Sequence, residues 1–162
     1  MQIRTVTSLA ITSVLVLAGC AGGQAAATAS APPPTAAPPA GATTIGVKLQ
    51  EWAITIDAAT APAGEVVFKI TNTGPDDVHE FVVLSTDLDM GALPVDATGK
   101  VSEDGGGIEA IDEVEDVAVG QSQDLKVTLK PGKYVLVCNI YDDKDKEAHY
   151  KMGMRVAFEV SG

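Results

Sequence analysis

The side chains of this sequence that are best suited to bind a transition metal are concentrated near its C-terminus. The stretch YVLVCNIYDDKDKEAHYKMGM contains Cys138, His149, Met152 and Met154, and His79 lies far upstream in VHEFVVLST. A thiolate, two imidazoles and a thioether form a mixed, soft donor set that accommodates both Cu(I) and Cu(II). The residue types therefore indicate a copper centre of the blue type.

Each of these residues also has a purely structural interpretation. Cys138 ends the apolar run 134–137, where a free cysteine often serves as a small buried hydrophobe. His79 fits a hydrogen-bonded histidine at the start of a strand, and His149 fits a surface residue. The combination favours a site, because these are the only two histidines and Cys138 is the only cysteine besides Cys20.

The N-terminus, MQIRTVTSLAITSVLVLAGC, is typical of an export signal. One Arg precedes an apolar run that is too short to span a bilayer, and small residues precede Cys20. The motif Leu17-Ala18-Gly19-Cys20 resembles the lipobox of bacterial lipoproteins, in which the cysteine is exposed by cleavage and acylated. The alternative is an ordinary signal peptide followed by an incidental cysteine. We expect a signal peptide over residues 1–19 and a lipid on Cys20 that anchors the protein to a membrane.

Residues 20–44 are rich in Ala and Pro and carry no charge, which predicts a flexible linker. Export places the protein in the periplasm or at the cell surface, an oxidising location. If Cys20 is acylated, Cys138 has no partner for an intrachain disulfide. A bound metal would occupy this otherwise free thiol.

The folded domain is expected over residues 45–162 and to be all-β. The segments IGVKLQEWAITID, APAGEVVFKITNTG and VHEFVVLST predict strands, and QSQDLKVTLKPGKYVLVCNI predicts two strands joined at the turn Pro131-Gly132. Short strands at this spacing predict a Greek-key sandwich or barrel. Loops at one end of such a fold come together, so we expect His79 and Cys138 to meet there.

The segment 87–120 differs from the rest of the domain in being rich in Asp, Glu and Gly. We expect it to pack loosely over one edge of a sheet, with one helical turn. Its acidic residues do not have the spacing of a calcium loop and are expected to form a solvated face.

Two segments carry a resemblance to a known family. HEFVVL after TNTGPDDV, and PGKYVLVCNI followed by HYKMGM and a final strand, resemble the cupredoxins, the small blue copper proteins of the plastocyanin and azurin type. The resemblance covers about residues 45–160. It implies that His79, Cys138 and His149 bind one copper ion and that Met154 is the weak axial ligand, with Met152 as the alternative.

The sequence departs from the family pattern at two places. Ten residues, NIYDDKDKEA, separate the cysteine from the second histidine, where better-known members have only a few. This longer loop either opens the copper site or ends metal binding. Glu80 also follows the first histidine, where the family often has Asn. A carboxylate there would lower the reduction potential unless it faces solvent.

The composition limits the function further. With 22 acidic and 11 basic residues the net charge is −11, which disfavours nucleic acid as a partner. The resemblance implies a monomeric single-electron carrier, not an enzyme, whose redox partner has a basic docking face. The alternatives are a copper carrier or storage lipoprotein, and a metal-free interaction module.

Overall fold

The computed structural model describes residues 41–162, so the predicted signal peptide, Cys20 and most of the linker lie outside the described residues. The described part is almost entirely β-structure with one short helix. The elements are β1 (Thr43–Gln50), β2 (Ala53–Ile56), β3 (Thr60–Pro62), β4 (Gly64–Asn72), β5 (His79–Thr86), β6 (Asp104–Gly105), β7 (Ile108–Val117), β8 (Ser122–Leu129), β9 (Gly132–Val137), β10 (Tyr141–Asp142), β11 (Glu147–Ala148), α1 (His149–Met152) and β12 (Arg155–Ser161).

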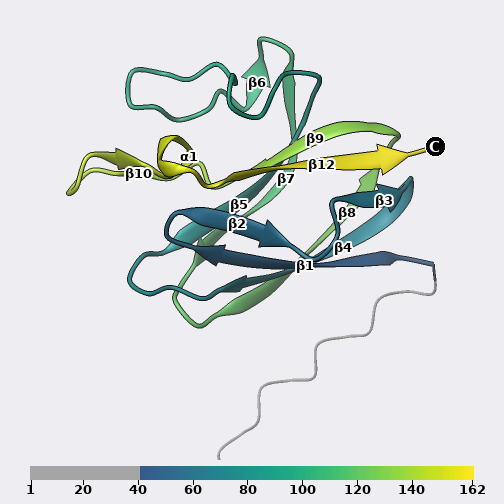
Figure 1. Cartoon of the computed structure of the whole chain (residues 1–162), viewed down its shortest axis with the longest axis horizontal. Helices are drawn as coiled ribbons and strands as arrows, with labels where there is room; N and C mark the ends of the chain where they lie inside the picture. Colours follow the sequence, from purple (N-terminus) through teal and green to yellow (C-terminus); the bar gives the residue numbers. More distant parts are fainter. Residues whose placement is uncertain (1–40) are drawn as a thin grey trace, which may run out of the picture. The chain divides into compact units, whose positions relative to one another are not determined.

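The strands form two sheets that pack face to face, with a separate small hairpin. One sheet has the order β2-β1-β4-β8, the other the order β3-β12-β9-β5-β7-β6, and β10 pairs with β11. β1 runs parallel to β4 and β3 parallel to β12, while the remaining neighbours are antiparallel. Figure 1 shows the two layers. The prediction of an all-β sandwich is confirmed.

The core between the sheets follows from the alternation of apolar and polar residues along the strands. In β8 only every second residue is buried, as expected for a sheet with one face in solvent. Phe68 of β4 lies at the centre, with its ring centroid 5.2 Å from that of Phe81 in β5 and 5.5 Å from that of Phe158 in β12. These rings join the two layers into a stiff support for the loops.

The segment 87–120 does not have the predicted structure. It contains no helix, and the ten-residue strand β7 pairs with β5 along its length. The outer face of β5 and β9 is apolar and needs a cover, which Leu93, Val101 and Ile108 provide together with Tyr150 of α1. The helical-turn prediction was wrong because sheet pairing and this second, smaller core determine the conformation, not the local Gly and Asp content.

The chain segments that carry the candidate ligands meet at one end of the sandwich. In Figure 1, α1 and β10 lie at the end opposite the C-terminus, where the β1–β2 turn and the β4–β5 loop also lie. Among residues 41–162 no helix is long and apolar enough to cross a bilayer.

Candidate metal centre

Three of the predicted ligands converge in the interior at this end of the sandwich. His79 Nδ1 lies 3.2 Å from His149 Nδ1, and Cys138 Sγ lies 3.9 Å from the first of these atoms and 3.3 Å from the second. All three residues are buried, with at most 1% of their surface exposed. The expectation that distant loops bring His79 to Cys138 is confirmed.

The spacing of the three donor atoms fits a single metal ion. A point equidistant from atoms 3.2, 3.3 and 3.9 Å apart lies about 2.0 Å from each of them. First-row metals such as zinc have bonds of roughly 2.0–2.1 Å to imidazole nitrogen and 2.3 Å to thiolate sulfur. Two imidazoles and one thiolate can therefore hold an ion with only small adjustments, and copper suits this donor set.

His79 is positioned by the tightly bonded loop before β5. The amide of Asn72 donates from Nδ2 to the carbonyl oxygens of Asp77 and Val117, at 2.7 and 2.8 Å, and its Oδ1 accepts from the N–H of Gly74 at 2.8 Å. His79 pairs with Val117 at the first residue of β5. The Asn72 side chain thus fixes the loop that delivers the imidazole.

Cys138 follows the last residue of β9 and is held from two sides. Its backbone N–H donates to the carbonyl of Met154 at 3.1 Å, and its Sγ accepts the backbone N–H of Glu80 at 3.3 Å. Burial raises the pKa of the Cys138 thiol to about 12. A cation is therefore required to hold the thiolate at neutral pH.

The ten-residue insertion before His149 folds back on itself. β10 and β11 form a hairpin, and the N–H of His149 donates to the carbonyl of Ile140 at 2.9 Å, which closes the base of the insertion. The Trp52 ring packs against the imidazole in a T-shaped arrangement, with ring centroids 5.1 Å apart. The insertion therefore projects outward, and His149 remains beside Cys138.

The two methionines differ in environment. Met154 is fully buried in the same core cluster as Cys138, whereas Met152 is 43% exposed. Gly153 separates them with φ of 134°, and a Cβ there would lie 2.8 Å from the carbonyl oxygen of Trp52. This glycine lets the chain turn from α1 into β12. Burial favours Met154 as the axial ligand, which remains a prediction.

Both imidazoles are held neutral by their surroundings. Burial lowers the pKa of His79, with a further lowering from the neighbouring His149, against an opposing effect from Glu51 and Asp77. Burial also lowers the pKa of His149, and Asp77 again acts in the opposite direction. Neutral imidazoles at physiological pH keep a nitrogen lone pair free for a metal.

Glu80 does not point into solvent. It is only 9% exposed, and its carboxyl group clusters with those of Glu103 and Glu113, their oxygens lying within 4.8 Å of one another. Burial and the repulsion from these neighbours raise the pKa of Glu80 to about 7. The carboxyl group next to the first ligand is therefore partly protonated at neutral pH.

Three further residues support the centre and were not found from the sequence. Glu51 and Trp52, in the turn between β1 and β2, lie against His79 and His149 respectively. Asn139 accepts the N–H of Val101 at 2.6 Å and donates to Glu103 Oε1 at 2.7 Å, so it fastens the segment 87–120 to the cysteine strand. Of these three residues, only Trp52 could have been singled out from the sequence, because it is the only tryptophan of the chain and lies in a turn between two strands.

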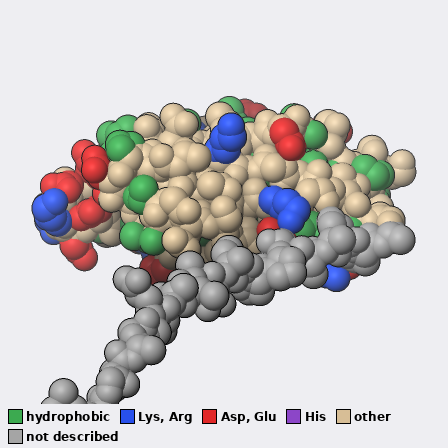
Figure 2. Space-filling view, turned by 90° about the horizontal axis from the view of Figure 1, so that it is seen from below, with side chains coloured by type: hydrophobic (Ala, Val, Ile, Leu, Met, Phe, Trp, Pro, Cys, Tyr) green, Lys and Arg blue, Asp and Glu red, His purple; other side chains and the backbone are tan. Residues whose placement is uncertain are grey.

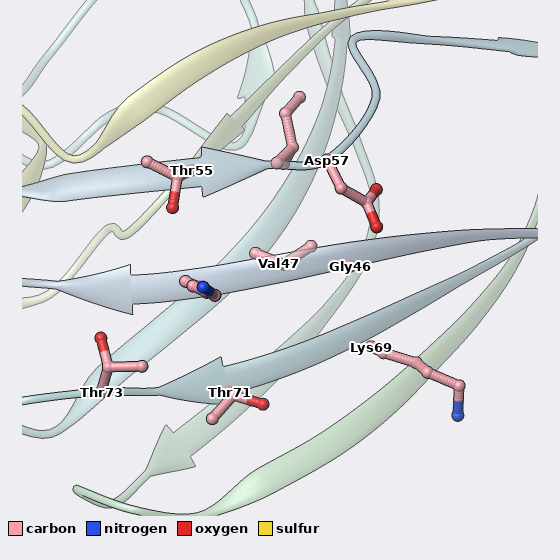
Figure 3. A pocket seen from close by; sticks show the side chains of 9 residues that line it. Gly46, Val47, Thr55, Asp57, Lys69, Thr71 and Thr73 are labelled. Carbon is pink, nitrogen blue, oxygen red and sulfur yellow. The ribbon is translucent and has the colours of Figure 1, made fainter.

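Two surface hollows differ in their relation to the centre. One, of about 430 Å³, opens over His149 and is otherwise lined by Asp76, Asp77, Val78, Asp116, Ile140, Tyr141 and Asp142. The other, of about 420 Å³, lies on the outer face of β1, β2 and β4 (Figure 3). Its lining of Thr, Lys and Asp residues together with Gly46, Val47 and Ile56 includes none of the three donors. Of these two hollows, only the first has one of the three donor residues in its lining.

Comparison with solved structures agrees with the fold. The sequence matches no protein-family model and no curated protein. Reduced auracyanin from Roseiflexus castenholzii matches with 25% identity and a TM-score of 0.53, over 74% of this chain and 98% of the auracyanin. Auracyanin A from Chloroflexus aurantiacus, described as a "blue" copper protein, matches with 17% identity, a TM-score of 0.51 and coverage of 75% and 100%. Rusticyanin from Thiobacillus ferrooxidans matches with 12% identity, a TM-score of 0.54 and coverage of 74% and 77%.

The sandwich has the fold of the cupredoxins, and the buried group His79, Cys138 and His149 fits a blue copper site. The resemblance in the two ligand-bearing segments is thereby confirmed, and this group can hold one metal ion.

Proposed function

We propose that this protein is a blue copper protein that carries single electrons between redox partners at the outer face of a membrane. The observation that carries the proposal is the convergence of His79, Cys138 and His149 at distances that fit one ion. Met154 supplies the weak axial contact. When bound, copper supplies the one-electron couple Cu(II)/Cu(I).

The chain contributes a preformed and shielded set of donors. β5, β9 and the closed hairpin place the three donors together, so little movement is needed when the charge of the ion changes. Trp52 and the sandwich core exclude water from the imidazoles. Ligands that move little and a metal site without water suit electron transfer better than chemistry on a substrate. We therefore propose the protein as an electron carrier and not as an enzyme.

A basic redox partner is supported by the charge around the exit from the centre. The hollow over His149 is lined by Asp76, Asp77, Asp116 and Asp142. Figure 2 shows acidic and basic side chains gathered at one end of the molecule, and the segment around the β10–β11 hairpin contributes Asp142, Asp143, Asp145 and Glu147 against Lys144 and Lys146. Negative potential over the shortest route to the metal steers a positively charged partner to it. The protein docks as a monomer.

The main alternative is a copper carrier or store. A carrier must release its ion readily, which requires ligands that an acceptor can reach. Here the three donors are at most 1% exposed. This burial favours retention of the ion and therefore electron transfer.

The rate of copper loss to a chelator, measured together with voltammetry, tests the proposal. We expect the copper-loaded protein to show reversible one-electron voltammetry and to lose Cu(I) to excess bicinchoninate over hours. Transfer within seconds, at a rate that rises with chelator concentration, would identify a carrier. If the protein binds no copper at all, the remaining hypothesis is a metal-free interaction module.

The proposed location rests on the N-terminal sequence. The export signal and the motif Leu17-Ala18-Gly19-Cys20 support a lipoprotein that is tethered by residues 20–44. The lipid would hold the centre near membrane-bound partners in the periplasm or at the cell surface.

A further inference from the structure

Glu51 lies behind the first histidine, on the side away from the other two donors. Its Oε1 accepts the backbone N–H groups of Asp76 and Asp77, at 3.1 and 2.7 Å. The same oxygen lies 3.6 Å from His79 Nε2. The side chain of Glu51 is 11% exposed and that of His79 is fully buried. A carboxylate is therefore enclosed with the imidazole.

The carboxylate of Glu51 and the imidazole of His79 each have a buried polar atom without a hydrogen-bond partner, and each group can supply a partner for the other. Within residues 41–162, Glu51 Oε2 and His79 Nε2 are the two buried side-chain polar atoms without a hydrogen-bond partner. A buried donor or acceptor that is left without a partner destabilises the folded state. His79 Nε2 lies 3.6 Å from Glu51 Oε1, which exceeds a hydrogen bond by a few tenths of an ångström. A small rotation of the carboxylate would bring one of its oxygens within hydrogen-bonding distance of Nε2.

The orientation of the ring gives this contact a role at the metal. His79 Nδ1 faces Cys138 and His149, while Nε2 faces Glu51. A metal-binding histidine commonly donates its other ring N–H to an acceptor, which fixes the tautomer and the ring orientation. With the proton on Nε2, the lone pair of Nδ1 points to the metal.

We propose that Glu51 is a positioning residue of the centre: its carboxylate holds the proton on His79 Nε2 and stabilises Cu(II) relative to Cu(I). The copper part of this inference rests on the proposed function, and the tautomer part does not. Glu51 acts through His79 and does not contact the ion.

Two backbone hydrogen bonds favour the ionised form of Glu51. Its Oε1 accepts the N–H groups of Asp76 and Asp77, and hydrogen bonds donated to a carboxylate stabilise its charged form. A carboxylate that is one imidazole away from the metal then adds a fixed negative charge. Such a charge favours the more positive ion.

Nitrogen-15 NMR of the purified protein, before copper loading and at neutral pH, tests the tautomer. We expect His79 to carry its proton on Nε2 in the wild type, and Glu51→Ala to shift the ring toward the Nδ1–H form. The expected result for Glu51→Gln is an intermediate population, because its amide oxygen still accepts a hydrogen bond. A wild-type His79 with the proton on Nδ1 would overturn the proposal, as would equal tautomer populations in all three proteins.

The reduction potential tests the effect of the charge. Glu51→Gln retains an oxygen for the two loop N–H groups and removes only the charge. We expect its potential to rise, with the Cu(I)-to-Cu(II) affinity ratio increasing about tenfold, as for a unit charge at short range in a protein interior. Glu159→Gln, on the exposed face at the far end of β12, is the control for net charge and should leave the potential unchanged.

The outcomes separate this inference from the proposed function. If the wild type gives the blue band and Glu51→Gln has the wild-type potential, the role of Glu51 in tuning is wrong while the electron carrier stands. If the wild type gives no blue band, the proposed function fails, and the NMR result alone decides whether Glu51 positions His79.

Discussion

The backbone N–H of Cys138 donates to the carbonyl oxygen of Met154 at 3.1 Å. This bond continues the pairing of β9 with β12 by one step into the centre, because Val137 pairs with Arg155. The bond holds Cys138 next to Met154, whose thioether is buried. The sheet that forms the core thus also determines which methionine accompanies the cysteine.

We predict that the two methionines respond differently to replacement by leucine. Met154→Leu should retain copper and raise the reduction potential, because a weak axial thioether chiefly tunes the potential. Met152→Leu, a matched change at an exposed position three residues after His149, should leave it unchanged. Protein-film voltammetry measures both. A shift for Met152→Leu with none for Met154→Leu would reassign the axial ligand to Met152.

We predict that Glu80 makes stability depend on pH. Its pKa is raised to about 7 in the folded protein, so the folded state binds the proton more tightly than the unfolded state does. The resulting stabilisation is complete below the unfolded pKa and is lost as the pH rises through about 7. Glu80→Gln should therefore be more stable than the wild type by up to about 3 kcal/mol at pH 8, with little difference at pH 4.

Urea unfolding of the protein before copper loading measures this effect. Glu109→Gln, an exposed residue of the neighbouring strand β7, is the matched control and should give no pH-dependent difference. A Glu80→Gln variant that is destabilised equally at both pH values would contradict the proposed burial of a protonated carboxyl group.

The sequence predicted the main elements of this fold because their pattern is local. The alternation in β8 and the turn at Pro131-Gly132 were sufficient to place β8 and β9. The segment 87–120 was mispredicted because β7 is almost wholly exposed on both faces and has no apolar alternation. Its conformation is determined by pairing with β5, a long-range contact that no local signal contains.

The three donors could be predicted from the sequence because they are rare residue types, whereas their supports could not. Glu51 and Asn139 belong to common polar types that usually lie in solvent. Only the tertiary structure shows that Glu51 is enclosed with His79 and that Asn139 bonds to Val101 and Glu103.

We predict that the acidic hairpin steers the redox partner. Two of its carboxylates, Asp143 and Asp145, form exposed ion pairs with Lys146 and Lys144, which contribute little energy and leave the hairpin net negative. Asp142 Oδ1 accepts the N–H groups of Lys144 and Asp145, and an asparagine can still do so. Replacing the four acidic residues of the hairpin by their amides should therefore preserve its fold.

Stopped-flow kinetics with a basic redox protein measures the steering. The association rate should fall about tenfold at low salt and its dependence on ionic strength should flatten, because attraction between exposed charges is screened beyond about 8 Å at physiological salt. The blue band should not change. If the dependence of the association rate on ionic strength is unaltered, the hairpin has no role in docking. In the control variant, four exposed acidic residues outside the hairpin are replaced by their amides, so that the net charge changes by the same amount. These residues are Asp57, Asp87, Glu109 and Glu159.

We predict that Cys20 carries the lipid. Cys20→Ala should abolish lipid attachment and leave the signal peptide uncleaved at residue 19, because the acylated cysteine is the site of processing in the motif that Leu17-Ala18-Gly19-Cys20 resembles. Mass spectrometry of the membrane fraction measures the modification. A mature wild-type chain that begins at another residue and bears no lipid would contradict this prediction.

The visible spectrum of the purified protein after addition of one equivalent of Cu(II) tests the central claim most directly. The buried group of His79, Cys138 and His149 predicts an intense thiolate-to-Cu(II) absorption band at stoichiometric copper, and Cys138→Ser should abolish it while the sandwich stays folded. Cu(II) bound stoichiometrically to a protein that stays colourless, or a band that persists in Cys138→Ser, would contradict the account.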